Sequence, residues 1–255
     1  MRLLLAALLA ATPALAQEAA PSLGGGDLSL AQEAPPASDS RTFQPPAGCT
    51  AYLTVQQSSC TVSHHYTCEG DPEGWQRRVD MDEGGIAYAG AIDAETQWME
   101  SLYFLSGHSE RLAPDPADPA SFTELAASGF DSFDFVTDSD EIGPTRYVGE
   151  DRLTGETVTV DGVTLDRTEF RVTAYDATGA EVWRTAGSEF ISRDWRMFLA
   201  GTSTTRLPDG QVFEEDSTPV EFVFPGEEGF LSVRPEHGCG QLMSKAPRSE
   251  VPSGE

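Results

Sequence analysis

The sequence predicts a mainly β protein: an antiparallel meander of about ten strands curled into a half-barrel or barrel, with one short helix at about Pro119–Ser128. Three observations predict this fold class. Apolar and polar residues alternate in many short segments, turn signals that contain glycine separate these segments, and most connections are short. Short connections favour antiparallel neighbours, and a sheet with so many strands must curl or close to cover its edges.

The clearest ribbon is Leu153–Leu165, with the sequence LTGETVTVDGVTL. Thr154-Gly155 and Asp161-Gly162 both read as two-residue turns, because glycine adopts the positive φ that such turns need. The turn at Asp161-Gly162 sets a register with one apolar face, which pairs Val160 with Val163 and Val158 with Leu165. The opposite face then carries Thr157, Thr159, Thr164 and Asp166.

At the N-terminus, residues 1–16 have the features of a secretory signal peptide. Arg2 supplies the positive charge, Leu3–Ala11 is an apolar run too short to span a bilayer, and Ala14-Leu15-Ala16 is a cleavage site. We therefore expect a periplasmic or secreted protein, processed near Ala16-Gln17, with no later segment that spans a membrane.

The composition divides the remaining chain into three parts. Residues 17–47 are rich in Ala, Pro, Ser and Gly and predict a disordered linker, and residues 243–255 predict a disordered tail. Between them we expect a single β-rich domain at residues 48–242.

This domain opens with CTAYLTVQQSSCTVSHHYTC, which predicts a hairpin. A turn at Ser58-Ser59 pairs Val55 with Val62, Leu53 with His64 and Cys49 with Cys68. In this register the apolar face carries three cysteines, Cys49, Cys60 and Cys68.

Four cysteines in an exported chain favour two disulfides, formed among Cys49, Cys60, Cys68 and Cys239. Three pairings are possible, and in each of them Cys239 is bonded to the opening hairpin. Such a bond closes a very long loop, which the chain-entropy model values at about 4–5 kcal/mol. The alternative is a zinc site, whose spacing would match no common zinc motif, formed by Cys60, His64, His65 and Cys68.

Periodicity and turn signals place the other elements in order. Before the helix we expect strands at residues 74–81, 86–92 and 97–105; after it, around Phe130–Phe135, and then at 169–175, 181–184, 190–201, 202–207, 212–214 and 220–224. In the helix, Asp118 suits the N-cap, Pro119 the first turn and Gly129 the C-terminal cap. Its apolar stripe consists of Phe122, Leu125 and Ala126.

The charge limits the possible partners. With Lys+Arg 16 and Asp+Glu 42, the formal net charge is -26. Such a field repels nucleic acids and anionic membrane surfaces, so we expect neither as a partner.

Motifs for catalysis are absent from the sequence. It contains no G-x-S-x-G, H-E-x-x-H, phosphate-loop or dinucleotide fingerprint. Gly107-His108-Ser109-Glu110 brings a histidine, a serine and a carboxylate together, but adjacent residues of a strand point apart. Asp80–Gly85 and Asp138–Glu141 match a calcium loop only in part. We therefore predict no catalytic residue, no metal and no other cofactor.

The aromatic residues are the candidates for a binding site. In a curved sheet they either form plain core or line a ligand cavity, and the candidates for the lining are Trp75, Trp98, Trp183 and Trp195.

Four segments carry a resemblance: CTAYLTVQQSSCTVSHHYTC, RLTGETVTVDGVTL, EFISRDWRMFLAGT and FPGEEGFLSVRP. They resemble a family of uncharacterised exported proteins of alphaproteobacterial type, which implies export but no particular activity. The layout of a meander with one helix is similar, at the level of the fold only, to LolA/LolB-type periplasmic lipid carriers.

The functional expectation is a non-enzymatic exported β-domain that binds a small hydrophobic or envelope-derived ligand. The alternative is a structural or interaction protein of the envelope. A third hypothesis is a hydrolase that uses two carboxylates.

Overall fold

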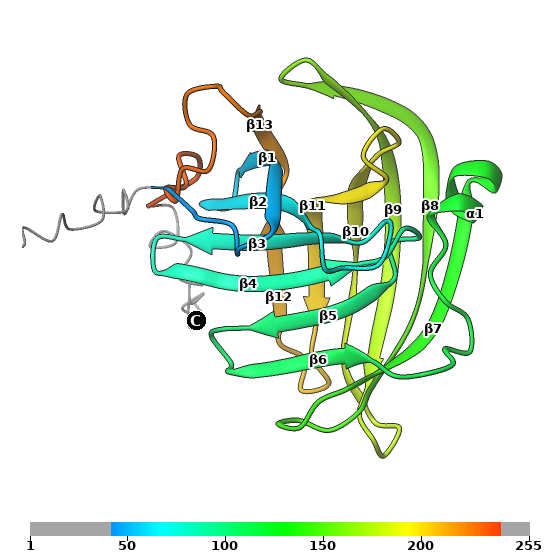
Figure 1. Ribbon diagram of the computed structural model, residues 1–255. Coiled ribbons are helices and arrows are strands. Elements are labelled where there is room, and N and C mark those ends of the chain that lie inside the picture. Colours follow the sequence, from blue (N-terminus) through cyan, green and yellow to red (C-terminus); the bar gives the residue numbers. More distant parts are fainter. Residues whose placement is uncertain (1–41, 241–255) are drawn as a thin grey trace, which may run out of the picture. The chain divides into compact units, whose positions relative to one another are not determined.

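The computed structural model describes residues 42–240, which form one antiparallel sheet of thirteen strands and, within that range, one short helix (Figure 1). The order of the strands is β12-β11-β10-β9-β8-β7-β6-β5-β4-β3-β2-β1-β13. Sequence neighbours are thus sheet neighbours throughout, apart from β13, which returns to pair with β1. The expected signal peptide, cleavage site and tail lie outside the described residues.

The elements before the helix are β1 (Cys49–Gln57), β2 (Thr61–Cys68), β3 (Gln76–Asp82), β4 (Gly85–Ile92), β5 (Trp98–Tyr103) and β6 (His108–Leu112). The helix is α1 (Phe122–Ser128). After it come β7 (Phe130–Asp138), β8 (Thr145–Val160), β9 (Val163–Tyr175), β10 (Glu181–Ser192), β11 (Met197–Arg206), β12 (Val212–Asp216) and β13 (Pro219–Val223).

The predicted fold class, a mainly β meander with one short helix, is confirmed. The sheet has more strands than the expected ten. β6 was not predicted, and a tight turn inside the segment 190–201 separates β10 from β11. In that turn the Ser192 hydroxyl accepts from Trp195 N, and Arg196 takes the left-handed conformation with φ 49.

The central ribbon has the predicted register at its tip. Val160 pairs with Val163 and Val158 with Leu165, and the turn residues Asp161 and Gly162 have φ 47 and 79. The predicted turn at Thr154-Gly155 is wrong. Gly155, with φ 82, lies in an irregularity inside β8, because the pairing with β9 shifts between Leu153 and Thr157 without ending the strand.

The predicted register of the opening hairpin is wrong near its turn. The turn has three residues, because Gln57 pairs with Thr61 and Cys60 adopts φ 59. Leu53 therefore pairs with His65 rather than with His64. A register shift between Ala51 and Leu53 compensates for the extra residue, so Cys49 still pairs with Cys68 as predicted.

Helix α1 ends at Gly129, as predicted, with φ 81 at that residue. Its predicted N-cap, Asp118, is wrong. Ser121 is the cap, since its hydroxyl accepts from Glu124 N at 3.1 Å, whereas Asp118 forms an isolated bridge with Asp134. Two residues of the predicted stripe, Phe122 and Leu125, are buried.

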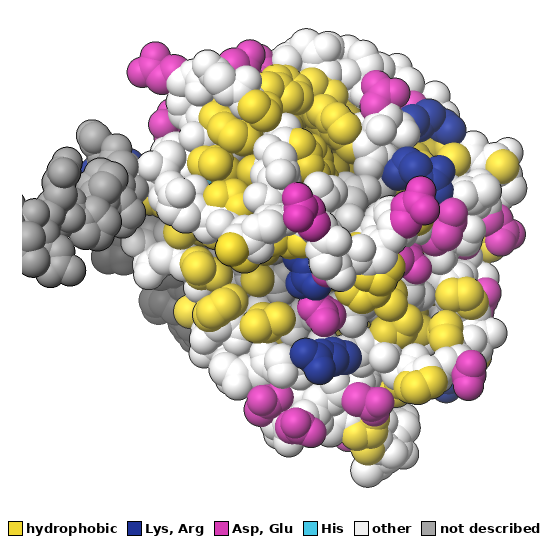
Figure 2. Space-filling model, in the orientation of Figure 1, with side chains coloured by type: hydrophobic (Ala, Val, Ile, Leu, Met, Phe, Trp, Pro, Cys, Tyr) yellow, Lys and Arg dark blue, Asp and Glu magenta, His cyan; other side chains and the backbone are white. Residues whose placement is uncertain are grey.

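The curl of the sheet brings strands from the two ends of its order together. One hydrophobic cluster combines residues of β1, β9, β10, β11 and β13: Leu53, Val55, Leu165, Phe190, Met197, Leu199 and Phe222. At the tip of the β8–β9 hairpin, the Asp161 carboxylate accepts from Phe222 N of β13 at 2.9 Å. Figure 2 shows hydrophobic side chains on the upper part of the molecule, where the β8–β9 hairpin approaches β13. The edge strands β12 and β13 do not pair within the described chain, so hydrogen bonds do not close the sheet into a barrel.

Both predicted disulfides are present, as Cys49–Cys68 and Cys60–Cys239. The zinc alternative is therefore wrong, because the sulfur atoms of Cys60 and Cys68 are bonded to other cysteines. The bond to Cys239 lies at the end of the segment that follows β13 and runs over β1. Along this segment Leu231 N donates to Thr54 Oγ1, and Glu236 N donates to Gln56 Oε1.

Two residues assigned to the linker also lie against the sheet. Thr42 forms a bridge with Ser232, and the ring of Phe43 stacks on His64 with 5.1 Å between ring centroids. The described structure thus begins before residue 48. Among the described residues, no helix has the length and apolar character needed to cross a membrane.

Candidate binding cavity

A cavity of about 430 Å³ lies between the two sides of the curled sheet. Its wall comes from β2–β5 on one side and from β7–β11 on the other, with Thr96 and Ala120 from the segments around the helix. The volume is in the range of sites for small molecules. The cavity therefore is the main candidate for a functional site in the described part of the chain.

Aromatic side chains form much of the cavity wall. Trp98 meets Phe135 and Tyr147 edge to face, with ring centroids 5.5 and 5.2 Å apart. Tyr147 also contacts Trp183, at 5.9 Å. Phe133 and Phe135 on β7 extend this apolar surface.

The four tryptophans proposed as ligand-lining residues divide into two pairs. Trp98 and Trp183 line the cavity. Trp75 and Trp195 line a separate, more open pocket of about 440 Å³, and Trp195 packs against Phe222 and Phe224. The sequence left open whether these tryptophans form core or line a cavity, and only the curl of the sheet decides which of them share one.

One arginine reaches the cavity with its charge already paired. Arg78 Nε lies 3.1 Å from Asp80 Oδ1, and its guanidinium lies 5.1 Å from the centre of the Tyr88 ring. The neighbouring Arg77 forms ion pairs with Asp71 at 2.6 Å and Glu100 at 3.0 Å. Basic groups at the cavity are thus balanced by acids of the same wall.

The wall formed by β7–β11 carries carboxylates where the opposite wall carries arginines. Asp151 on β8 and Glu189 on β10 both line the cavity. Burial raises the pKa of Asp151 to about 8, with a further contribution from the charge of Glu189. Burial also raises the pKa of Glu189 to about 7, although the charge of Arg78 opposes this change. The next acid in the same row, Asp131 on β7, pairs with Asp151 in register and has a pKa raised by burial to about 6.

The two histidines of β2 are buried and neutral. Burial lowers the pKa of His64 to about 4 and that of His65 to about 3, where Arg78 and His64 add to the effect. His64 Nδ1 lies 3.0 Å from Thr54 Oγ1, and His65 lines the cavity. Both are therefore polar residues of the interior, and only His65 lines the cavity.

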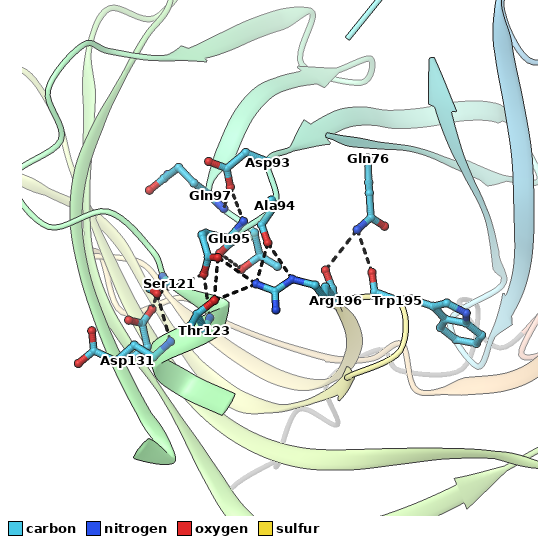
Figure 3. A network of polar contacts seen from close by, with 12 residues as sticks. Gln76, Asp93, Ala94, Glu95, Gln97, Ser121, Thr123, Asp131, Trp195 and Arg196 are labelled. Atoms are coloured by element: carbon cyan, nitrogen blue, oxygen red, sulfur yellow. Dashed lines mark hydrogen bonds and ion pairs between the residues drawn. The ribbon is translucent and has the colours of Figure 1, made fainter. Parts of the chain in front are cut away.

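A polar network lies at the start of the helix, and one of its residues, Gln76, also lines the cavity (Figure 3). Glu95 accepts hydrogen bonds from Thr123 N, Thr123 Oγ1 and Ser121 Oγ, and it pairs with Arg196 Nη2 at 2.9 Å. Arg196 also donates to Ala94 O and lies over the ring of Phe122. On its other side, Gln76 Nε2 donates to the carbonyls of Trp195 and Arg196. These bonds hold the turn between β10 and β11 against the start of α1.

Sequence reasoning missed a chain of hydrogen bonds beside the cavity. Ser106 Oγ lies 2.7 Å from His108 Nδ1, and His108 Nε2 lies 3.2 Å from Glu110 Oε1. The other oxygen of Glu110 accepts from the hydroxyls of Tyr147 and Thr137. The expectation that His108 and Ser109 point apart ignored Ser106. His108 and Glu110 lie two residues apart on one face of β6, and Ser106 precedes them in the turn; this spacing was the available signal. We call this Ser106–His108–Glu110 chain the relay.

Comparison of the chain with protein-family models, curated proteins and solved structures finds no match.

Proposed function

We propose that this protein is an exported binding protein that holds a small, largely apolar ligand inside its curled sheet. The observation that carries the proposal is the cavity of about 430 Å³ with Trp98 and Trp183 in its wall. Apolar walls with a few polar groups are typical of small-molecule sites. Export is supported by the features of residues 1–16 and by the two disulfides, which persist in oxidising compartments.

The binding test uses a neutral apolar dye whose fluorescence rises in apolar surroundings, together with mass spectrometry of the intact protein for co-purified ligands. Val172 lines the cavity and Arg171, its neighbour on β9, is exposed on the opposite face. We expect Val172→Trp to fill the cavity and weaken dye binding at least about 10-fold, whereas Arg171→Trp leaves binding unchanged. Equal dye affinity in both variants, with both folded by circular dichroism, would remove the support for a binding cavity.

The relay favours a second candidate function, hydrolysis through a serine nucleophile. A serine, a histidine and a carboxylate in hydrogen-bonded order are the groups of the hydrolase triad, and Ser106 is exposed. The test is a fluorophosphonate probe, whose phosphorus the Ser106 oxygen would attack with loss of fluoride. Labelling that disappears in Ser106→Ala but persists in Ser109→Ala would support this function, and no labelling would argue against it.

A further inference from the structure

The charges that line the cavity are unevenly distributed between its two walls. On the wall formed by β3, Arg78 has Asp80 at 3.1 Å and Tyr88 beneath its guanidinium. On the wall formed by β8 and β10, Asp151 and Glu189 face the cavity. Among the described residues that line the cavity, only the second wall presents acidic groups without a hydrogen bond or ion pair.

Asp151 is the more deeply buried of these acids. Its exposed fraction is 8%, and it lines the cavity. In register it lies between Asp131 of β7 and Phe170 of β9, so its immediate neighbours are another acid and an aromatic ring. Within residues 42–240, its carboxylate has neither a hydrogen-bond donor nor an ion-pair partner. A carboxylate buried without a donor is costly in its charged form.

Glu189 occupies an irregular place on β10. It pairs with Thr168 of β9, while on its other side the pairing with β11 shifts between Ser188 and Phe190. Such irregularities redirect side chains. The Glu189 carboxylate is also without a hydrogen bond or ion pair in the described chain; Arg78 acts on it through its charge. Other acids close to the cavity differ, since Glu95, Glu100 and Glu110 each accept hydrogen bonds or form ion pairs.

The aromatic wall complements a positive charge as well. The faces of aromatic rings carry negative partial charge and attract ammonium groups within about 6 Å of the ring centre. Trp98, Trp183 and Phe170 line the same cavity as the two carboxylates. An organic cation can satisfy both features of this wall, because its charged nitrogen meets the carboxylates and its carbon atoms meet the rings.

We propose that the ligand of this cavity is a small organic cation, a primary amine or a quaternary ammonium compound with an apolar body. Its nitrogen lies near Asp151 and Glu189, and its apolar body lies against Trp98 and Trp183. The inference rests on the proposed binding function and adds the charge of the ligand to it. An anionic ligand is disfavoured because Arg78, the cation it would need, is already paired with Asp80.

The test compares three probes of similar size by calorimetry: phenyltrimethylammonium, its neutral isostere tert-butylbenzene, and the anion phenylacetate. Because burial raises the pKa of Asp151 to about 8, the titrations are made at pH 9. The charged or titratable groups that line the cavity are His65, Arg77, Arg78, Tyr88, Tyr103, Asp151 and Glu189. We expect the cation to bind at least about 10-fold more tightly than the neutral probe.

The variants separate this inference from the proposed function. In the double variant Asp151→Asn, Glu189→Gln, the preference for the cation should disappear while the neutral probe still binds. The matched control is Glu169→Gln, an exposed acid beside Phe170 on β9, which should keep the preference. Equal binding of cation and neutral probe, tighter binding of phenylacetate, or a cation preference that survives the double substitution overturns the inference and leaves the binding function intact. Failure of all three probes to bind contradicts both.

Discussion

Cys60 and Cys239 are bonded across a sequence separation of 179 residues, and this bond holds the end of the described chain over β1. Beside it, Cys60 N donates to His237 O, and Gln56 Nε2 donates to Arg234 O. The outer face of β1 is therefore covered by a segment without strands of its own. The buried state of Thr54 and Gln56 depends on that cover.

Loss of the long-range disulfide should destabilise the protein more than loss of the short-range one. The chain-entropy model gives about 5 kcal/mol for a loop of 179 residues and about 3 kcal/mol for the 19-residue loop of Cys49–Cys68. We expect denaturant unfolding of Cys60→Ser, Cys239→Ser to show the larger loss of unfolding free energy, compared with Cys49→Ser, Cys68→Ser. Equal losses would show that the segment after β13 stays in place without its covalent bond.

Glu110→Ala should cost about 3 kcal/mol of unfolding free energy. Glu110 is 4% exposed, and its removal leaves the buried hydroxyl of Tyr147 without its acceptor and that of Thr137 with only the Thr145 carbonyl, at 3.5 Å. Thermal and urea unfolding measure the effect. Glu228→Ala serves as the control, because Glu228 is exposed and should change stability by less than about 0.5 kcal/mol. A loss for Glu110→Ala as small as in the control would mean that water replaces the carboxylate.

Arg196→Ala should loosen helix α1 without unfolding the sheet. The substitution removes donors to Ala94 O, Glu95 and Thr123, together with the contact over Phe122. We expect faster hydrogen exchange of the α1 amides and a loss of about 1–2 kcal/mol in unfolding free energy. Arg196→Lys should restore little, because an ammonium lacks the forked donors of the guanidinium. Arg206→Ala, at an exposed position, should leave exchange in α1 unchanged.

The cavity acids should lower the stability of the ligand-free protein as the pH rises. Burial raises the pKa of Asp151 to about 8 and of Glu189 to about 7, above about 4 for these groups in an unfolded chain. Between pH ~4 and pH ~8, the folded state therefore binds more protons than the unfolded state. The stability that these groups contribute is complete below pH ~4 and is lost as the pH rises through 7 and 8.

The difference between Asp151→Asn and the unchanged protein isolates this effect. Its unfolding free energy relative to the parent should increase from pH 6 to about pH 8 and then level off, since the amide cannot ionise and the parent carboxyl is ionised in both states above its folded pKa. The same difference for Glu169→Gln should stay constant over that range. A flat profile for Asp151→Asn would show that the carboxylate is solvated in the folded protein.

Local signals in the sequence were sufficient for the fold class and for several turns. Asp161-Gly162 needs positive φ at both residues, and the alternation on either side of it sets the pairing of Val160 with Val163. Gly129 ended the helix for a similar local reason. Errors arose where two local signals compete, as at Thr154-Gly155, where a glycine marks an irregularity inside a long strand instead of a turn.

The sequence by itself determined that the chain is an antiparallel β meander with paired cysteines, since these features depend on neighbouring residues and on composition. Only the tertiary structure decided which cysteines pair, which tryptophans share a cavity and which acids line it. The physical reason is that the curl of a sheet is a sum of twists and register shifts over many strands. Trp98, Asp151 and Glu189 come together because β5, β8 and β10 lie on facing sides of that curl, a relationship that no local pattern of residues contains.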